Sequence, residues 1–144
     1  MDFIYPESVS FSCSMCGICC GDTNEKKRHI LMLSEEVNQI SEKIGKNSLN
    51  FATINQNQPP YLYEMKKNEK GTCIFLSENK CDIYSIRPLI CRFYPFELID
   101  LPDGKYEILF TNECPGISKG KKIEKEHFIK LFLLACSKFK ILSL

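Results

Sequence analysis

The sequence predicts a small α+β domain with short antiparallel strands, a loop-rich cysteine cluster and a C-terminal amphipathic helix. Three observations support this fold class. Apolar residues recur at helical spacing near the C-terminus, short apolar segments alternate with turn residues in the middle, and four cysteines crowd into a glycine-punctuated segment near the N-terminus. Because 144 residues are typical of one domain, we expect a single domain over residues 1–144.

The C-terminal segment carries the strongest helical pattern. Its apolar residues step by four and three positions over about four helical turns. This spacing places them on one face, so we expect a C-terminal helix that supplies much of the apolar core. The residues of this face are Phe128, Phe132, Ala135, Phe139 and Leu142.

A second helix is predicted near residue 34. Ser is a favourable N-cap, and the acidic residues at 35 and 36 fall in the first turn, where the helix dipole stabilises negative charge. A glycine after the last apolar position is a typical helix stop. The helix is therefore expected to have Ser34 as its N-cap, to end before Gly45, and to bury Val37, Ile40 and Ile44.

Short strands are expected between these two helices. Apolar and aromatic segments alternate with clusters rich in Gly, Asn, Asp and Ser, and the polar segment 47–60, which ends in two prolines, predicts a loop. Pro88 is placed to start a short helix that carries Cys91. The predicted strands are Tyr61–Met65, Thr72–Leu76 and Tyr106–Phe110, with turns at 66–71, 77–80 and 102–104.

The cysteines form a pattern that packing alone does not explain. Eight of the nine cysteines belong to it: four occur within eight residues as Cys-x-x-Cys-x-x-Cys-Cys, and four more follow singly between residues 73 and 114. A cysteine side chain offers little apolar area and is open to oxidation, but its thiolate is a strong ligand for soft metals. We therefore expect a domain organised around metal. The predicted ligands are Cys13, Cys16, Cys19, Cys20, Cys73, Cys81, Cys91 and Cys114.

Composition and charge bear on the cellular location of the protein and on its partners. The formal net charge is +1, and the lysines are interleaved with glutamates, which gives no basic surface for nucleic acid. The apolar runs are too short to span a membrane, and Asp2 stands where a signal peptide would be basic. We expect a cytoplasmic protein with no nucleic-acid or membrane partner, in which the thiols stay reduced and available to metal.

The spacing of the first cysteines bears on the identity of the metal. Ligands at positions i, i+3 and i+6 wrap a cubane iron–sulfur cluster in bacterial ferredoxins, where a remote Cys-Pro supplies a further attachment. Cys114 and Pro115 form such a remote Cys-Pro in this chain. Zinc sites more often use two separated Cys-x-x-Cys pairs. The spacing therefore favours an iron–sulfur cluster of the 4Fe-4S type, with zinc as the alternative.

Adjacent cysteines bear on how the ligands are divided. Neighbouring side chains on an extended backbone point to opposite sides, so both would not bind the same small ion. Two metal sites are then natural, and the alternative is one metal held by four cysteines, with the others structural. The preferred division places Cys13, Cys16 and Cys19 with a remote cysteine such as Cys114, and Cys20 with Cys73, Cys81 and Cys91.

Five residues outside this set also bear on the predicted metal site. Arg87 and Arg92 flank a cysteine and would offset the negative charge of a thiolate centre, although ordinary surface ion pairs are the alternative. Cys136 adjoins the apolar face of the C-terminal helix, so we expect a buried core thiol there. His29 and His127 are expected to be solvated or hydrogen-bonded rather than metal ligands.

The cysteine pattern resembles a known family. Residues 81–96 are CDIYSIRPLICRFYPF, in which the element Tyr-x-x-Arg-Pro-x-x-Cys-Arg-x-Tyr-Pro is specific. Together with the N-terminal cysteine run, this segment resembles the cysteine-cluster proteins of the YkgJ type, a family of zinc- or iron-chelating domains. The resemblance extends from about Cys13 to Cys114, and Leu89 stands where the family often has a small residue such as Ser. It implies iron–sulfur or zinc binding.

Two classes of function follow from these features. The first is a metal-binding protein that holds an iron–sulfur cluster in an electron-transfer or accessory role, the latter with a protein partner, or that uses zinc structurally. The second is a metal-dependent protein-modifying enzyme, because the flagellin lysine methylases carry a similar cysteine pattern in a longer protein. The sequence has no Gly-x-Gly-x-x-Gly turn, phosphate loop or obvious acid–base pair, which favours the first class.

Overall fold

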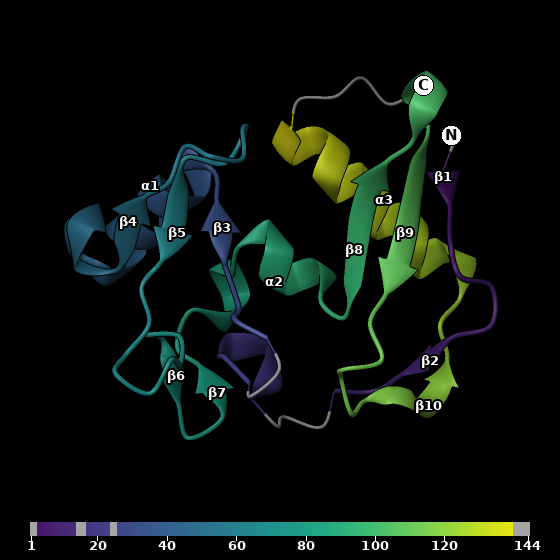
Figure 1. The fold of residues 1–144 in the computed structure, drawn as a ribbon, viewed down its shortest axis with the longest axis horizontal. Coiled ribbons are helices and arrows are strands. Elements are labelled where there is room, and N and C mark those ends of the chain that lie inside the picture. The colour runs from purple at the N-terminus through teal and green to yellow at the C-terminus, as the bar shows by residue number, and fades with distance from the viewer. Residues whose placement is uncertain (1–2, 14–16, 24–25, 140–144) are drawn as a thin grey trace. The chain divides into compact units, whose positions relative to one another are not determined.

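The computed structural model describes residues 3–13, 17–23 and 26–139, which form an α+β protein with short strands and three α-helices (Figure 1). The predicted fold class is confirmed. The chain divides into two compact units. The terminal unit combines residues 1–14 with 93–144, and the central unit contains residues 15–92. The expectation of one domain over residues 1–144 stays a prediction.

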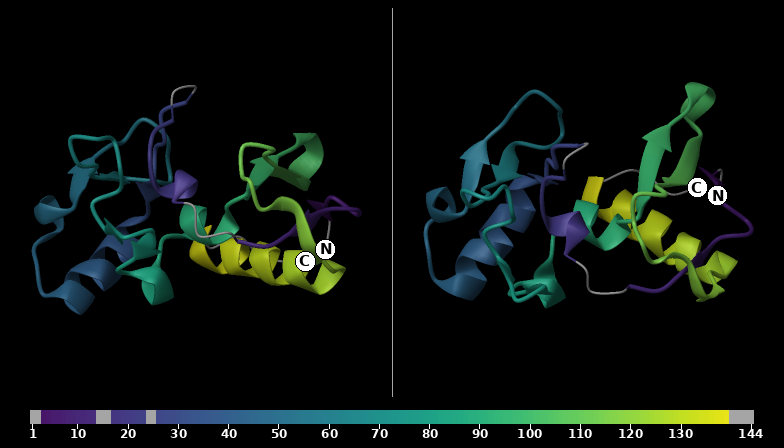
Figure 2. Two further views of the ribbon diagram at one scale, coloured as in Figure 1. Left: turned by 90° about the horizontal axis from the view of Figure 1, so that it is seen from below. Right: turned by 60° about the horizontal axis from the view of Figure 1, so that its bottom comes forward.

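A three-stranded sheet and the C-terminal helix form the core of the terminal unit. The strand order is β1–β9–β8, with β1 parallel and β8 antiparallel to β9. Helix α3 runs along one face of this sheet (Figure 2). Aromatic rings pack between them, as where Phe132 stacks on Phe3 with ring centroids 4.6 Å apart. The bounds are β1 (Phe3–Ile4), β8 (Phe96–Asp100), β9 (Tyr106–Phe110) and α3 (Lys125–Phe139).

The amphipathic pattern predicted for the C-terminal helix is confirmed over residues 125–139. Phe128 is fully buried, stacks with Tyr5 and meets Phe96 edge-on at 5.1 Å between ring centroids. Leu142 lies outside the described residues. The helix supplies the core of its own unit, whereas the central unit has a separate buried cluster. The buried residues of α3 are Phe128, Leu131, Phe132, Ala135 and Cys136.

A second strand pair places the chain segment that leads to Cys13 beside the segment that follows Cys114. β2 (Ser10–Phe11) pairs antiparallel with β10 (Ile117–Lys122). Just beyond this pair, the Ser12 N–H donates to the Gly116 carbonyl at 3.1 Å. A Cβ on residue 116 would lie 2.3 Å from the Ser12 carbonyl oxygen, so the approach requires glycine. The segment that ends in Cys13 therefore lies beside the segment that begins at Cys114.

The central unit contains the antiparallel sheet β3–β5–β4 and the helix α1. The helix ends at Gly45, whose φ is +68° and whose N–H donates to the Ser41 carbonyl at 2.9 Å. The predicted helix is thus confirmed, with Leu33 rather than Ser34 at the N-cap. The bounds are β3 (Leu31–Met32), α1 (Ser34–Ile44), β4 (Ala52–Ile54) and β5 (Tyr63–Met65).

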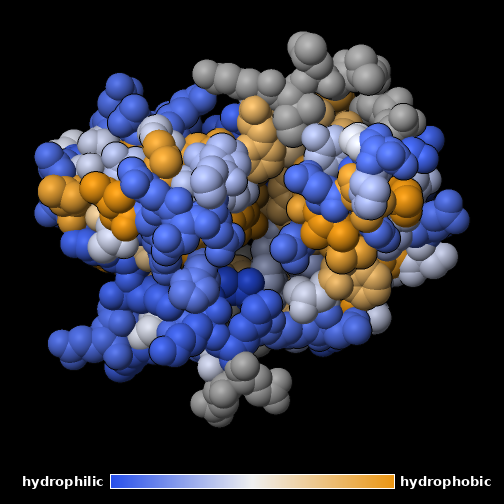
Figure 3. All heavy atoms as spheres, turned by 45° about the horizontal axis from the view of Figure 1, so that its top comes forward, coloured by the Kyte–Doolittle hydropathy of each residue, from blue (hydrophilic) through white to orange (hydrophobic). Residues whose placement is uncertain are grey.

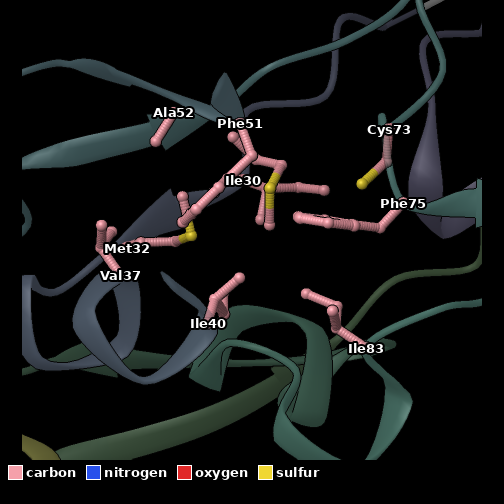
Figure 4. Packing of buried hydrophobic residues seen from close by; sticks show 10 residues of the cluster. Ile30, Met32, Val37, Ile40, Phe51, Ala52, Cys73, Phe75 and Ile83 are labelled. Carbon is pink, nitrogen blue, oxygen red and sulfur yellow. The ribbon is translucent and has the colours of Figure 1, made fainter. Parts of the chain in front are cut away.

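Buried side chains from this sheet, from α1 and from the loops that follow form one apolar cluster (Figure 4). Val37 and Ile40 belong to it, and Ile44 packs against it, as the sequence predicted for that helix face. Figure 4 shows Cys73 beside Phe75 at one side of the cluster. The cluster consists of Ile30, Met32, Val37, Ile40, Phe51, Ala52, Met65, Cys73, Phe75 and Ile83.

A hairpin and short helices complete the central unit. Strands β6 (Leu76–Ser77) and β7 (Lys80–Cys81) are joined by Glu78 and Asn79, which have left-handed φ values of +50° and +63°. Such values are typical of a tight two-residue hairpin, so the predicted turn at 77–80 is confirmed. The short helix predicted after Pro88 is α2 (Leu89–Phe93), which follows the 3₁₀ turn η3 (Tyr84–Ile86).

The structure differs from two other local predictions and confirms a third. The segment 47–60 was expected to be a loop, but it contains η2 (Ser48–Asn50) and strand β4, whose Ala52 pairs with Met65 and is fully buried. The strand expected at Thr72–Leu76 is interrupted, because residues 72 and 73 form isolated bridges and residues 74 and 75 form a turn. The strand Tyr106–Phe110 and the turn before it, η4 (Pro102–Gly104), were predicted correctly.

The surface exposes both hydrophilic and apolar side chains. On the face seen in Figure 3, exposed apolar side chains form small patches between hydrophilic ones. Isolated exposed apolar residues are ordinary on protein surfaces. Within residues 3–13, 17–23 and 26–139, none of the helices combines the length and apolar character that crossing a bilayer requires.

The burial of α3 leads to a prediction for stability. Replacing Phe128 with Ala removes a fully buried ring and leaves a cavity beside Tyr5 and Phe96. We expect the free energy of unfolding to fall by about 3–5 kcal/mol, measured by denaturant titration. The matched control is Leu133→Ala on the same helix, where the side chain is 41% exposed. That change is expected to stay within about 0.5 kcal/mol, and equal losses in both variants would contradict the packing described for α3.

Candidate metal centre

Several predicted ligands lie together in the central unit, although they come from segments far apart in the chain. They lie on the 3₁₀ turn η1 (Ile18–Cys20), in the loop before β6, at the end of β7, and on α2. One of them is part of the apolar cluster, and three others pack against it. These thiols are Cys19, Cys20, Cys73, Cys81 and Cys91.

Cys19 and Cys20 point toward each other, with their Sγ atoms 3.8 Å apart. The Cys20 N–H donates to the Gly17 carbonyl at 3.0 Å, which closes η1. The expectation that their side chains point to opposite sides was wrong, because it assumed an extended backbone and the backbone here is helical. A hydrogen bond from Cys20 lowers the pKa of Cys19, and the same hydrogen bond raises the pKa of Cys20.

Backbone contacts hold Cys73 against η1. The Cys73 N–H donates to the Cys20 carbonyl, and Gly21 pairs with Thr72 in an isolated bridge. A Cβ on residue 21 would lie 3.2 Å from the Gly71 carbonyl oxygen, so the two chains approach closely there. Cys73 is 5% exposed, and its burial raises the pKa of its thiol.

Asp22 joins the segment after η1 to the loop that contains Lys67 and Gly71. Its Oδ1 accepts hydrogen bonds from the Lys67 ammonium at 2.8 Å and from the Arg28 backbone N–H at 2.7 Å, and both lower the pKa of this carboxyl. Its own N–H donates to the Gly71 carbonyl at 2.9 Å. Sequence reasoning missed Asp22 and Lys67. The signal for Asp22 was its place directly after the cysteine run and Gly21.

Cys81 and Cys91 lie within electrostatic reach of the other thiols. Burial raises the pKa of both, and the nearby Cys73 and Cys19 thiols raise the pKa of Cys91 further. Cys81 is placed by the β6–β7 hairpin, in which it pairs with Leu76. Each thiolate makes it harder for the neighbouring thiols to lose their protons. A bound cation would remove this obstacle, because it offsets the negative charge of the thiolates.

Two arginines supply positive charge to this cluster of thiols. After the hydrogen bond from Cys20, the charges of Arg28 and Arg87 also lower the pKa of Cys19. The Arg87 guanidinium stacks over the Tyr84 ring at 3.9 Å from its centroid and donates to the Tyr84 carbonyl at 2.8 Å. The proposed electrostatic role of Arg87 is thus supported, and Arg28 joins it.

Arg92 serves a different purpose from Arg87. Its guanidinium donates to the Ser85 carbonyl at 3.1 Å and to the Arg87 carbonyl at 3.2 Å. These hydrogen bonds brace the segment between η3 and α2. Arg92 therefore acts on the backbone that carries Arg87 and Cys91.

The remaining predicted ligands belong to the terminal unit or lie outside the described residues. Cys13 is exposed and Cys114 is buried, both in the terminal unit. Cys16 lies outside the described residues. The preferred division into two metal sites stays a prediction. Its first site contains Cys13, Cys16, Cys19 and a remote cysteine such as Cys114, and its second contains Cys20 with Cys73, Cys81 and Cys91.

Cys136 and the two histidines behave as expected from the sequence. Cys136 is 4% exposed on α3, as expected for a core thiol. His29 Nδ1 hydrogen-bonds to Glu64 Oε2 at 2.9 Å, and its side chain is 58% exposed. His127 is exposed, and its ring lies edge-on to Phe128.

The chemistry of the gathered thiols fits a soft metal. Thiolates are preferred ligands for zinc and for iron–sulfur clusters, and the nearby guanidinium groups would offset their negative charge. In the described part of the chain, no group of three or more His, Cys, Asp or Glu side chains is arranged so that it could hold a metal ion.

A small α+β fold with thiols gathered against its apolar core defines a cysteine-rich metal-binding protein. Residues 12–130 match the family described as "CxxCxxCC: Putative zinc- or iron-chelating domain". The match covers most of the chain, and the chain belongs to this family. The resemblance stated from the sequence is confirmed, and family membership supports metal binding.

Two relatives come from the archaeon Methanocaldococcus jannaschii. The uncharacterized protein MJ0661 is 30% identical over 132 residues, which cover 87% of this chain and 68% of the relative. The uncharacterized protein MJ0939 is 37% identical over 70 residues, which cover 45% of this chain and 25% of the relative. No solved structure matches the chain.

The Cys19–Cys20 hydrogen bond predicts unusual thiol titration in the metal-free protein. Because Cys20 stabilises the Cys19 thiolate, the pair should lose its first proton below the ordinary thiol pKa of about 8.5. The pH dependence of iodoacetamide alkylation, resolved by mass spectrometry, measures this midpoint. Cys20→Ala removes the donor and should shift the midpoint of Cys19 upward, whereas Cys136→Ala should not. A Cys19 midpoint that ignores Cys20 would contradict the hydrogen bond.

Proposed function

We propose that the chain holds an iron–sulfur cluster and serves in an electron-transfer or accessory role. The observation that carries this proposal is the gathering of thiols from four separate segments in the central unit. An iron–sulfur cluster bound there would supply one-electron chemistry. The residues that would hold it are Cys19, Cys20, Cys73, Cys81 and Cys91, with Cys13, Cys16 and Cys114 as the further ligands expected from the sequence.

The iron–sulfur assignment rests on spacing, charge and surroundings. The ligand run at i, i+3 and i+6 suits a cluster whose iron atoms are separated in space. Arg28 and Arg87 supply the positive charge that a thiolate-bound cluster requires nearby. The apolar cluster behind Cys73 limits the access of water, which is a lever on the reduction potential of such centres.

Structural zinc is the second candidate, and one distance favours it. The Sγ atoms of Cys19 and Cys20 lie 3.8 Å apart. Two thiolates bound at about 2.3 Å to one tetrahedral zinc ion lie about 3.8 Å from each other. In that arrangement, Cys19 and Cys20 would share one ion, and the metal would hold the surrounding loops together.

Metal analysis decides between the two candidates. Anaerobically purified protein is expected to be brown, with a broad absorption near about 400 nm and bound iron and sulfide. Cys73→Ser should lose most of this colour because it removes a ligand, and Cys136→Ser should keep it because that thiol lies in the core of α3. Colourless protein with stoichiometric zinc would establish the zinc candidate, and protein without bound metal would contradict both.

Removal of the metal should loosen the central unit selectively. Its cysteine-bearing elements are a two-residue strand, a 3₁₀ turn and a five-residue helix, which are weakly stable by themselves. After treatment with a chelator, we expect faster amide exchange and proteolysis in residues 67–91 than in α3. The same protection with and without metal would show that the fold does not depend on it.

A further inference from the structure

Glu36 is a buried carboxylate that the sequence marked only as a favourable charge in the first turn of α1. It is 2% exposed. Carboxylates are rarely buried unless hydrogen bonds compensate for the water that they lose. The partners of this side chain therefore indicate what the burial accomplishes.

Both oxygen atoms of Glu36 accept backbone hydrogen bonds. Oε1 accepts from the Leu33 N–H at 2.9 Å, and Oε2 accepts from the Leu89 N–H at 2.6 Å. Both donors lie at helix N-termini, where backbone N–H groups otherwise have no intrahelical partner. One charged side chain thus ties the start of α1 to the start of α2.

The helix α2 carries Cys91, two residues after Leu89. It has five residues, far too few to be stable alone, so external contacts fix its position. Cys91 also lies within electrostatic reach of Glu36, and that charge adds to the burial and neighbouring thiols that oppose the thiolate form. Because this charge disfavours the thiolate, any benefit of Glu36 to metal binding is geometric.

We propose that Glu36 is a positioning residue for Cys91, which it holds among the other thiols by anchoring the N-terminus of α2. This inference rests on the proposed function, because it assumes that Cys91 is a metal ligand. Glu36 belongs to α1, whereas the thiols of the proposed metal centre belong to other segments. The role proposed for Glu36 is positioning rather than coordination, and it rests on the two backbone hydrogen bonds that its oxygen atoms accept.

The test is metal protection of each thiol in Glu36→Gln. The amide can accept only one of the two hydrogen bonds and turns an NH₂ group toward the other donor. The full-length chain is reduced, loaded with Zn²⁺ alone and treated with iodoacetamide, and mass spectrometry follows each cysteine. Protection of Cys91 should weaken about tenfold, as for other groups that orient ligands, while Cys19, Cys20 and Cys73 keep theirs.

A neighbouring residue offers a matched control. Glu35 has the same side chain in the same helical turn but is exposed, so Glu35→Gln should leave every thiol protected as in the unmodified protein. Glu36→Asp, which is one methylene too short to reach both donors, should repeat the selective loss at Cys91 with the charge retained.

The outcomes separate this inference from the proposed function. If neither Zn²⁺ nor a cluster reconstituted with iron and sulfide protects any thiol in the unmodified protein, the metal-binding proposal fails and the role of Glu36 fails with it. If Cys91 stays protected in Glu36→Gln while the unmodified protein binds zinc, only the positioning role is overturned. Equal loss at all of the thiols would also overturn it, because Glu36 would then support the whole unit rather than Cys91.

Discussion

The central unit depends on carboxylates that accept hydrogen bonds from distant parts of the chain. Asp22 accepts from Lys67 and from the Arg28 backbone, and Glu36 accepts from Leu89. The segments joined in this way contain too few internal hydrogen bonds to hold their own positions. Hydrogen bonds to a charged acceptor are stronger than neutral ones. These contacts, with the apolar cluster beneath them, keep the thiol-bearing loops together.

The charges of the central unit are arranged by sign. Asp22 and Glu36 are engaged by backbone N–H groups or by Lys67, whereas Arg28 and Arg87 act on the Cys19 thiol. Thiols gathered without positive charge would resist ionisation, because each thiolate opposes the next. The arginines reduce this repulsion, and a bound cation would reduce it further. The close grouping of thiols, which opposes their ionisation in the metal-free protein, thus favours metal binding.

Membership in a zinc- or iron-chelating family and the gathered thiols point to the same chemistry from independent directions. The family match rests on the cysteine pattern, and the structure adds the elements that hold the pattern together. Glu36 and Asp22 illustrate the difference, since neither is a predicted ligand and both fix segments that carry predicted ligands. The proposed metal centre therefore depends on the whole central unit rather than on its cysteines alone.

The sequence by itself determined the fold class, α1, α2, α3, the β6–β7 turn and β9, because periodicity, caps and turn residues are local properties. It also predicted the candidate metal ligands, from the chemistry of the thiols. It did not predict the paired strands β1, β2, β8 and β10, or β4 within a polar segment, since short strands show little periodicity and are defined by partners elsewhere. Tertiary structure alone decided that Cys19 and Cys20 face each other and that Glu36 is buried. Both depend on backbone geometry and on contacts between distant segments, which local sequence patterns do not encode.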